Sequence, residues 1–387
     1  MTNPNDDRKN KNDALALTMS GGGARAAYQV GLLRCISRNF PELQMPIITG
    51  VSAGAINAVY LASHQSEFKD AVDGLTKAWC GVTPDQIFKA DSTSILTNIF
   101  RWSVSLLAGK QSKRFKTRGL VNANPLRHFL ESHLDTNNGV ITGIGENLNN
   151  GRLNAVAVSS TNYQTGQTIT WTQGCDLRTW ERINQRSWET ELSIDHVMAS
   201  AALPLFFPAV KVDNAWYGDG GLRLYAPLSP AIHLGANKIL AISTRYNRTV
   251  EEEFRPMVTG YPPPAQIVGV MLNGIFLDLL DQDADRLMSM NEILRKLPRQ
   301  EWGNKRIIKL FILRPSMDLG LLAGEYEEKL PHFFRYFMRG QGVHETSSPD
   351  WLSMVLFQHQ YVRRLIELGE EDAQNRLDEL KDFFYED

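Results

Sequence analysis

Cysteine is scarce in this chain. Its 387 residues include three cysteines, Cys35, Cys80 and Cys175, which stand far apart in the sequence. Three scattered thiols cannot form the disulfide framework of a small secreted domain, and they lack the paired spacing of a zinc site. The cysteine content therefore favours a reducing compartment, and we expect a cytoplasmic protein without a bound metal.

Long hydrophobic runs and an excess of charge of one sign are also absent. No apolar run reaches the ~18 residues that a membrane-spanning helix requires. The 41 basic side chains are balanced by 43 acidic ones, so the composition gives no support for a nucleic-acid-binding surface. The segment Met1–Asp13 is rich in Asn, Asp and Lys and lacks the apolar core of a signal peptide, which predicts a disordered tail.

A serine stands in a Gly-x-Ser-x-Gly pattern between an apolar run and a stretch of small residues. Ile47–Val51 predicts a buried strand, and apolar residues at helical spacing follow Ser52. Gly50 and Gly54 flank the serine, as a nucleophile elbow requires for its strained backbone and close strand–helix approach. A plain glycine-rich turn with a solvent-facing serine fits the same five residues, so the motif alone leaves both interpretations open.

A glycine-rich turn comes before that serine in the chain. A short apolar run predicts a first buried strand, and Gly21, Gly22 and Gly23 lead from it into a helix, where exposed N–H groups favour an anion. Ala26 stands where a dinucleotide fingerprint has its third glycine. Alanine is permitted there, but no clear ribose-binding acid follows, and a P-loop is excluded because Gly-Lys-Ser/Thr is missing. The nearby elbow favours an oxyanion hole over a tight turn without a ligand.

The order strand, glycine-rich turn, helix, strand, elbow and helix forms one βαβα unit. Parallel strands place both turns at the same edge of the sheet, which is the usual ligand-binding edge. We therefore expect an α/β fold in which a mostly parallel central sheet is sandwiched by helices and the glycine-rich turn lies near Ser52.

The remaining chain continues the alternation of helices and strands. The patterns predict, in order, a hairpin at 153–172, a helix at 193–202, a helix at 227–234, a strand at 238–243, a long helix or helical pair at 264–297, a strand at 306–313 and an amphipathic segment at 361–380. The apolar segment 203–208 suits either an acyl-chain pocket or ordinary core.

An aspartate between glycines follows a further predicted strand. Asp219 is followed by Gly220 and Gly221, and such small neighbours let the backbone approach another loop closely. A simple Asp-Gly turn is the alternative. Of the nearest histidines, His196 and His233, the second would give the Ser–Asp–His order of α/β-hydrolases. His233 lies in the middle of a predicted helix, which favours a packed or surface role instead.

Three motifs in this order resemble one family. Gly-Gly-Gly-Ala-Arg at 21–25, Gly-Val-Ser-Ala-Gly at 50–54 and Asp-Gly-Gly at 219–221 are similar to the motifs of patatin-like phospholipases. The segment 199–208 resembles the one that precedes Asp-Gly-Gly in that family. The resemblance covers residues 14–245 well, and the C-terminal third resembles bacterial members more loosely.

The resemblance implies a Ser–Asp dyad rather than a Ser–His–Asp triad. Carried over, Ser52 is the nucleophile and Asp219 is the base. The family's oxyanion hole maps onto the N–H groups of Gly21, Gly22 and Gly23. Arg25 matches a basic position beside that hole, where it would bind an anion or substrate. The sequence departs from the family pattern at Ala26, where many members carry glycine and where a methyl group would narrow the turn.

The predicted domain organisation has three parts. We expect a disordered tail at 1–13, a patatin-like catalytic α/β domain at 14–245, and a C-terminal helical extension with one late strand at 246–387, packed on the same domain. Residues 83–120 combine apolar residues with a basic cluster. That combination fits a lid or membrane-touching insertion, or else a packed helical excursion with a solvated basic loop.

The expected function is hydrolysis of acyl esters of lipids through a Ser52 acyl-enzyme, with Asp219 taking the serine proton. An unperturbed aspartate is a weak base at pH 7, so this mechanism requires an environment that raises the pKa of Asp219. We expect a lipid or fatty-acyl ester substrate, peripheral membrane contact, no nucleic acid and no cofactor. The alternatives are an acyl-thioesterase or acyltransferase with the same dyad, and a non-catalytic lipid-binding protein.

Overall fold

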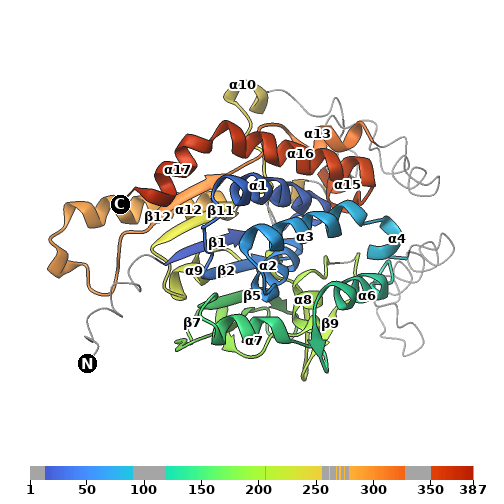
Figure 1. The fold of residues 1–387 in the computed structure, drawn as a ribbon, viewed down its shortest axis with the longest axis horizontal. Helices are drawn as coiled ribbons and strands as arrows, with labels where there is room; N and C mark the ends of the chain where they lie inside the picture. Colours follow the sequence, from blue (N-terminus) through green and yellow to red (C-terminus); the bar gives the residue numbers. More distant parts are fainter. Residues whose placement is uncertain are drawn as a thin grey trace.

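A computed structural model describes residues 14–89, 119–204, 206–254, 279–326 and 350–386, together with positions 261, 267, 270, 271 and 274. The predicted tail at 1–13, most of the candidate lid at 83–120 and most of the first half of the predicted helical segment at 264–297 lie outside the described residues. The described part of the chain is built on a ten-stranded sheet with helices on both faces (Figure 1).

Parallel strands form one half of the sheet. They are, in spatial order, β12 (Lys309–Leu313), β11 (Lys238–Ile242), β1 (Leu15–Met19), β2 (Ile47–Val51) and β5 (Ala155–Asn162). The strands β1 and β2 are buried along their whole length, which explains why their sequences are apolar runs without alternation. β12 comes from the predicted C-terminal extension and adds to the edge of the same sheet.

The other half of the sheet is mixed. β6 (Thr168–Gly174) returns antiparallel to β5 as a hairpin, β8 (Gln185–Glu189) runs parallel to β6, and β7 (Glu181–Arg182) is antiparallel to β8. β10 (Ala215–Asp219) pairs antiparallel with both β5 and β9 (Val210–Val212). The predicted α/β class with a mostly parallel sheet is confirmed.

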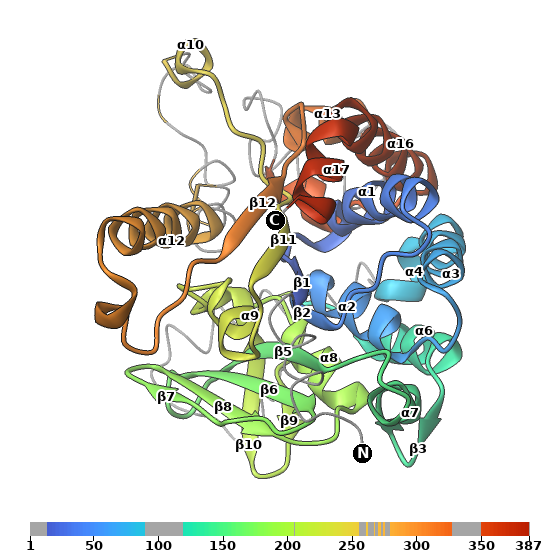
Figure 2. The same ribbon diagram turned by 60° about the vertical axis from the view of Figure 1, so that its left-hand side comes forward.

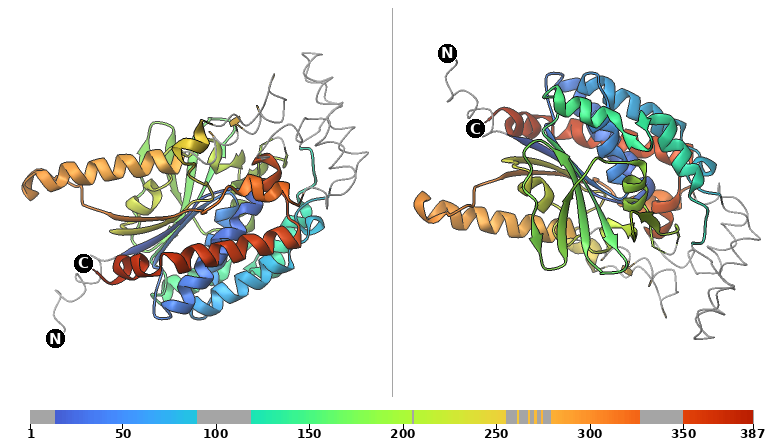
Figure 3. Two further views of the ribbon diagram at one scale, coloured as in Figure 1. Left: turned by 90° about the horizontal axis from the view of Figure 1, so that it is seen from above. Right: turned by 90° about the horizontal axis from the view of Figure 1, so that it is seen from below.

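Two apolar cores separate the sheet from the helical layers. On one face, α1 (Ala26–Asn39), α2 (Ala53–Ser63), α3 (Phe68–Gly81), α16 (His359–Asn375) and α17 (Leu377–Tyr385) pack over the strands (Figures 1 and 2). On the other face, α9 (Ser229–His233) and α12 (Leu279–Lys296) cover side chains such as Ala16 and Ile239. The views from above and below show the sheet between these layers (Figure 3), so the predicted three-layer sandwich is confirmed.

Shorter elements complete the described residues. The helices are α4 (Pro84–Ile87), α6 (Asn124–His133), α7 (Thr142–Asn149), α8 (Ile194–Ser200), α10 (Val250–Glu253), α13 (Leu319–Gly324) and α15 (Asp350–Val355). A small separate hairpin is formed by β3 (Thr136–Asn137) and β4 (Val140–Ile141). Single 3-10 turns occur at Gly23–Arg25, Gly220–Leu222 and Arg299–Glu301.

Several sequence predictions differ from the structure in extent. The helix predicted at 227–234 is only Ser229–His233, and the amphipathic segment at 361–380 is two helices that separate at Arg376. The hairpin of β7 and β8 was not predicted. Its short strands carry exposed polar and charged side chains, so they lack the apolar alternation by which strands are recognised.

Candidate active site

Ser52 lies in the turn between β2 and α2. Its backbone has φ 57° and ψ −132°, a combination that residues with a side chain rarely adopt. The turn is closed by a hydrogen bond from the Ala55 N–H to the Ser52 carbonyl, with an N–O distance of 2.9 Å. The backbone thus makes the sharp strand-to-helix turn that a nucleophile elbow requires.

The glycines predicted around the site lie at close contacts between backbones. A Cβ added to Gly54 would lie 2.4 Å from the Ser20 carbonyl oxygen, and one added to Gly50 would lie 2.4 Å from the Gly54 carbonyl oxygen. At Gly220 an added Cβ would lie 2.1 Å from the Ser159 carbonyl oxygen. Side chains at these positions would push apart the segments that carry the serine, the glycine-rich loop and the aspartate.

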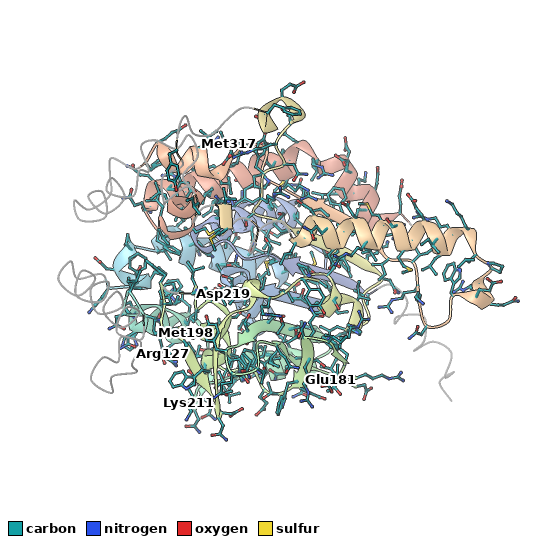
Figure 4. All side chains as sticks on the ribbon, turned by 180° about the vertical axis from the view of Figure 1, so that it is seen from behind. Arg127, Glu181, Met198, Lys211, Asp219 and Met317 are labelled. Carbon is teal, nitrogen blue, oxygen red and sulfur yellow. The ribbon has the colours of Figure 1, made fainter. Side chains whose placement is uncertain are left out.

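The sheet topology brings Asp219 to Ser52. β2 runs beside β5 as far as the pair Val51–Ser159, and β10 runs beside the same side of β5 in the opposite direction, ending at the pair Asp219–Ser160. The ends of β2 and β10 therefore meet. The Ser52 Oγ donates to Asp219 Oδ2 at 2.5 Å. Figure 4 shows Asp219 in the interior of the molecule, in contrast to Glu181 and Lys211 on the periphery.

The Asp219 carboxyl group is fully buried. It accepts hydrogen bonds from the Ser52 hydroxyl and, at 2.9 Å, from the Gly221 N–H. Burial raises the pKa of Asp219 from 3.8 to about 7, and the two hydrogen bonds oppose part of that rise. An acid of this strength is half ionised near neutral pH, which suits a general base.

A residue that the sequence analysis did not single out supports the elbow. Ser200, at the end of α8, accepts a hydrogen bond from the Ser52 N–H at 3.0 Å and donates to the Ser159 carbonyl at 2.6 Å. Its hydroxyl thus ties the serine turn to β5. The sequence placed Ser200 in the family-like segment 199–208, but no local pattern specifies its contacts.

The glycine-rich loop follows β1 directly beside the serine. A Cβ added to Gly21 would lie 2.8 Å from the Ser52 Cβ. Gly22 has φ 143° and Gly23 has φ 58°, both in the region that favours glycine. Within the described residues, the N–H groups of Gly21, Gly22 and Gly23 have no hydrogen-bond acceptor. They are available as donors next to the Ser52 hydroxyl.

Ala26 and Arg25 follow the loop. Ala26 has φ −64°, an ordinary helical value, and is completely buried at the start of α1, so alanine in place of the family's glycine brings no backbone strain. Arg25 is also buried, and its Nε donates to Ser353 Oγ of α15 at 2.6 Å. This contact joins the loop to the C-terminal part of the chain. The role of Arg25 in binding an anion or substrate stays a prediction.

An apolar pocket opens at Ser52. Its volume is about 750 Å³ including the open mouth, and Gly22 and Gly23 form part of its wall. Among the other lining side chains are Ile56, Trp79, Phe129, Phe206, Phe207 and Phe357. The segment 203–208, for which the sequence left pocket and core open, contributes Leu203 and two phenylalanines to this wall.

The histidines that were alternatives to the dyad have other contacts. His233 stacks on Trp180 with ring centroids 4.6 Å apart, and burial lowers its pKa to about 4. His196 packs against Trp171 and its Nδ1 contacts Ser193. Since Ser52 donates directly to Asp219, the geometry gives no support to a histidine-based triad.

Two further features concern cofactors and membranes. In the part of the chain that the structure describes, no group of three or more histidine, cysteine and carboxylate side chains is arranged to hold a metal ion. None of the helices in the described ranges is long and apolar enough to span a membrane.

Comparisons with known proteins place this chain in a family. Solved structures similar to the chain include VipD from Legionella pneumophila (13% identity, 95% of this chain and 67% of that one, TM-score 0.36), human GIVD cytosolic phospholipase A2 (10%, 97% and 60%, TM-score 0.47) and the effector ExoU of Pseudomonas aeruginosa (13%, 95% and 53%, TM-score 0.37). The chain thus spans between about half and two thirds of their lengths.

No curated protein matches the sequence. The family model for patatin-like phospholipase matches residues 17–232. The chain therefore belongs to the patatin-like phospholipase family.

Proposed function

We propose that this protein is a serine hydrolase that cleaves acyl esters of lipids. The observation that carries the proposal is the 2.5 Å contact between the Ser52 hydroxyl and the buried Asp219 carboxyl group. The glycine-rich loop and an apolar pocket lie next to the same hydroxyl. A nucleophile with its base, donors for an oxyanion and an apolar binding surface are the parts that acyl transfer from a lipid requires.

The reaction proceeds in two steps. Asp219 accepts the Ser52 proton while the serine oxygen attacks the carbonyl carbon of the ester. The negative charge on the carbonyl oxygen is stabilised by N–H groups of Gly21, Gly22 and Gly23, a contribution of ~3–4 kcal/mol for each well-placed donor. Collapse of the tetrahedral intermediate releases the alcohol, which takes the proton from Asp219. Water then attacks the acyl-enzyme with Asp219 again as base, and the fatty acid leaves as the Ser52 oxygen takes the proton back from Asp219.

The pocket supports an aliphatic acyl group as the part of the substrate that is bound. Aromatic and aliphatic side chains line it, so a hydrocarbon chain would bury apolar area there at a gain of ~25 cal/mol per Å². An acyl-thioesterase or acyltransferase would use the same residues. Turnover of phospholipid, lysophospholipid, monoacyl ester and acyl-thioester, measured side by side, distinguishes these substrate classes.

Free cysteines support a cytoplasmic location, and a lipid substrate would bring the protein into peripheral contact with lipid surfaces. Cys35 is buried, Cys80 is half-buried and Cys175 is exposed, and none of the three forms a disulfide. An exposed free thiol is typical of a reducing compartment. Fractionation of cells in low and high salt would test both parts of this assignment.

The dyad is tested by release of p-nitrophenol from medium-chain esters. We expect the wild type to be active, and Ser52→Ala and Asp219→Asn to lose activity while circular dichroism shows an intact fold. Reaction with a fluorophosphonate probe should label the wild type and not Ser52→Ala. If a folded variant keeps its activity, the substituted residue is not the nucleophile or the base that we propose. A wild type that binds phospholipid vesicles but releases no acyl group would instead be a lipid-binding protein.

A further inference from the structure

A chain of buried hydrogen bonds leads from the wall of the pocket to the glycine-rich loop. The Trp79 indole N–H donates to Asn57 Oδ1 at 2.7 Å. Asn57 Nδ2 donates to Gln29 Oε1 at 2.9 Å, and Gln29 Nε2 donates to the Ser20 carbonyl at 2.7 Å. The three side chains come from α3, α2 and α1, so this series of hydrogen bonds connects three helices of one layer to the glycine-rich loop.

Trp79 determines how the amide groups of Asn57 and Gln29 are oriented in this series of hydrogen bonds. An indole N–H can only donate, so the oxygen of Asn57 must face Trp79 and its NH₂ group must face Gln29. Gln29 then accepts through its oxygen, and its NH₂ group is directed at Ser20. Both amides are completely buried, and water cannot replace a lost partner. A flipped amide would leave buried donors and acceptors unpaired.

The last bond determines where the loop's first N–H group points. Because a trans peptide is planar, its carbonyl oxygen and its N–H point in opposite directions. The Ser20 carbonyl is held toward Gln29, so the N–H of Gly21 in the same peptide is held in the opposite direction. The next peptide is restrained in the same way, since Thr244 Oγ1 donates to the Gly21 carbonyl at 2.7 Å.

We propose that Gln29 and Asn57 are positioning residues that orient the glycine-rich loop, and that Trp79 anchors them from the wall of the apolar pocket. The inference rests on the proposed function, because it concerns the donors that stabilise the oxyanion. Asn57 also donates to the Ala26 carbonyl at 3.2 Å, so it holds the loop's exit into α1 as well as its entrance. One buried side chain thereby restrains both ends of the loop.

The test compares kcat and KM for p-nitrophenyl butyrate and p-nitrophenyl decanoate. Gln29→Met keeps the length of the side chain and removes its hydrogen bonds, and Trp79→Phe removes the indole N–H but keeps an aromatic wall. We expect kcat to fall about 10- to 100-fold in Gln29→Met and about 3- to 10-fold in Trp79→Phe, on both esters alike, with KM changed less than about twofold. The pH at half-maximal kcat should stay unchanged, because Asp219 is untouched.

Tyr28→Phe is the matched control for loss of a buried hydrogen bond. Tyr28 precedes Gln29 on α1, but its hydroxyl donates at 2.8 Å to Asp372 of α16, away from the loop. This variant should keep kcat within about twofold while its melting temperature falls. If Gln29→Met does not fold, the kcat of Trp79→Phe tests the positioning role instead.

The outcomes separate this inference from the proposed function. A folded Trp79→Phe with the kcat of the wild type overturns the positioning role, as does an equal loss of kcat in Tyr28→Phe. A loss confined to the decanoate KM overturns it too, since that would show only a pocket contact. A wild type inactive on both esters, or active after Ser52→Ala, overturns the proposed function and this inference with it.

Discussion

At the scale of single residues, the Asp219 carboxyl group combines complete burial with only two hydrogen-bond donors. Lacking a positive partner among these contacts, it has a raised pKa of about 7 rather than the low value of an ion-paired carboxylate. The burial that raises this pKa also lowers the free energy of unfolding when the carboxyl group is ionised. Activity and stability should therefore respond to pH in opposite directions.

The activity should rise with pH through the pKa of Asp219. The proposed base must be ionised to accept the Ser52 proton, so we expect kcat/KM for a p-nitrophenyl ester to increase about tenfold per pH unit below pH 7 and to level off above it. The measurement is a pH–rate profile between pH 5 and 9, within the range where circular dichroism shows a folded protein. A profile flat from pH 5 upward would contradict the raised pKa.

The stability of the fold should show the opposite trend. The folded-state pKa of Asp219 lies above its unfolded value of 3.8, so the folded state binds the proton more tightly and its stability falls as pH rises from about 4 to 7. Three pKa units correspond to about 4 kcal/mol. We expect Asp219→Asn, which cannot ionise, to gain free energy of unfolding relative to the wild type at pH 8 but not at pH 4. Urea titrations at the two pH values provide the comparison, and equal differences at both would refute it.

At the scale of elements, the helix α16 is joined to α1 by a buried polar contact. The Tyr28 hydroxyl donates to Asp372 Oδ2, which also accepts from the Ser316 N–H at 2.9 Å, and burial raises the pKa of Tyr28 well above its usual value. Asp372 therefore connects both helices to the segment that follows β12. Tyr28 lies on the helix that follows the glycine-rich loop, but its contact serves packing rather than the loop.

Tyr28→Phe should weaken this junction. The change removes one buried hydrogen bond and leaves the Asp372 carboxylate with fewer donors, which costs about 1–3 kcal/mol of unfolding free energy. Chemical denaturation of the two proteins at pH 7 measures the difference. A loss below about 0.5 kcal/mol would mean that the hydroxyl contributes little to the packing of α1 against α16.

At the scale of the whole molecule, the family match ends at residue 232 while the fold continues. β12 pairs along β11 in full register, and α16 buries Tyr361, Leu365 and Ile366 almost completely. Ser353 of α15 contacts Arg25 beside the glycine-rich loop. The later segments thus complete both the sheet and the surroundings of the site.

A chain that ends at residue 245 should therefore not fold by itself. It would expose the edge of β11 and the apolar surface that α16 covers, and such surfaces promote aggregation. We expect loss of the cooperative thermal transition and elution as aggregates in size-exclusion chromatography. A soluble, monomeric chain 1–245 with a sharp transition would show instead that the first 245 residues form an independent domain.

Local patterns were enough to predict the parts that depend on neighbours in the chain. Buried strands were recognised as apolar runs. Ser52 and Gly21–Gly23 lie in turns that need glycine because of their backbone angles and the close approach of neighbouring segments. The pairing of Ser52 with Asp219 was reached only through the family resemblance. Its physical cause is the end-to-end meeting of β2 and β10 against β5, a property of strand register.

The sequence by itself determined the α/β class, the strand-to-helix turn at Ser52 and the glycine-rich turn, because each of these follows from residue types at short spacing. Only the tertiary structure decided which distant side chains support them. Ser200 holds the elbow, while Gln29, Asn57 and Thr244 hold the loop, and each acts on a segment elsewhere in the chain. The pKa of Asp219 was likewise decided by burial, which arises when three layers close around the site and no short stretch of sequence encodes it.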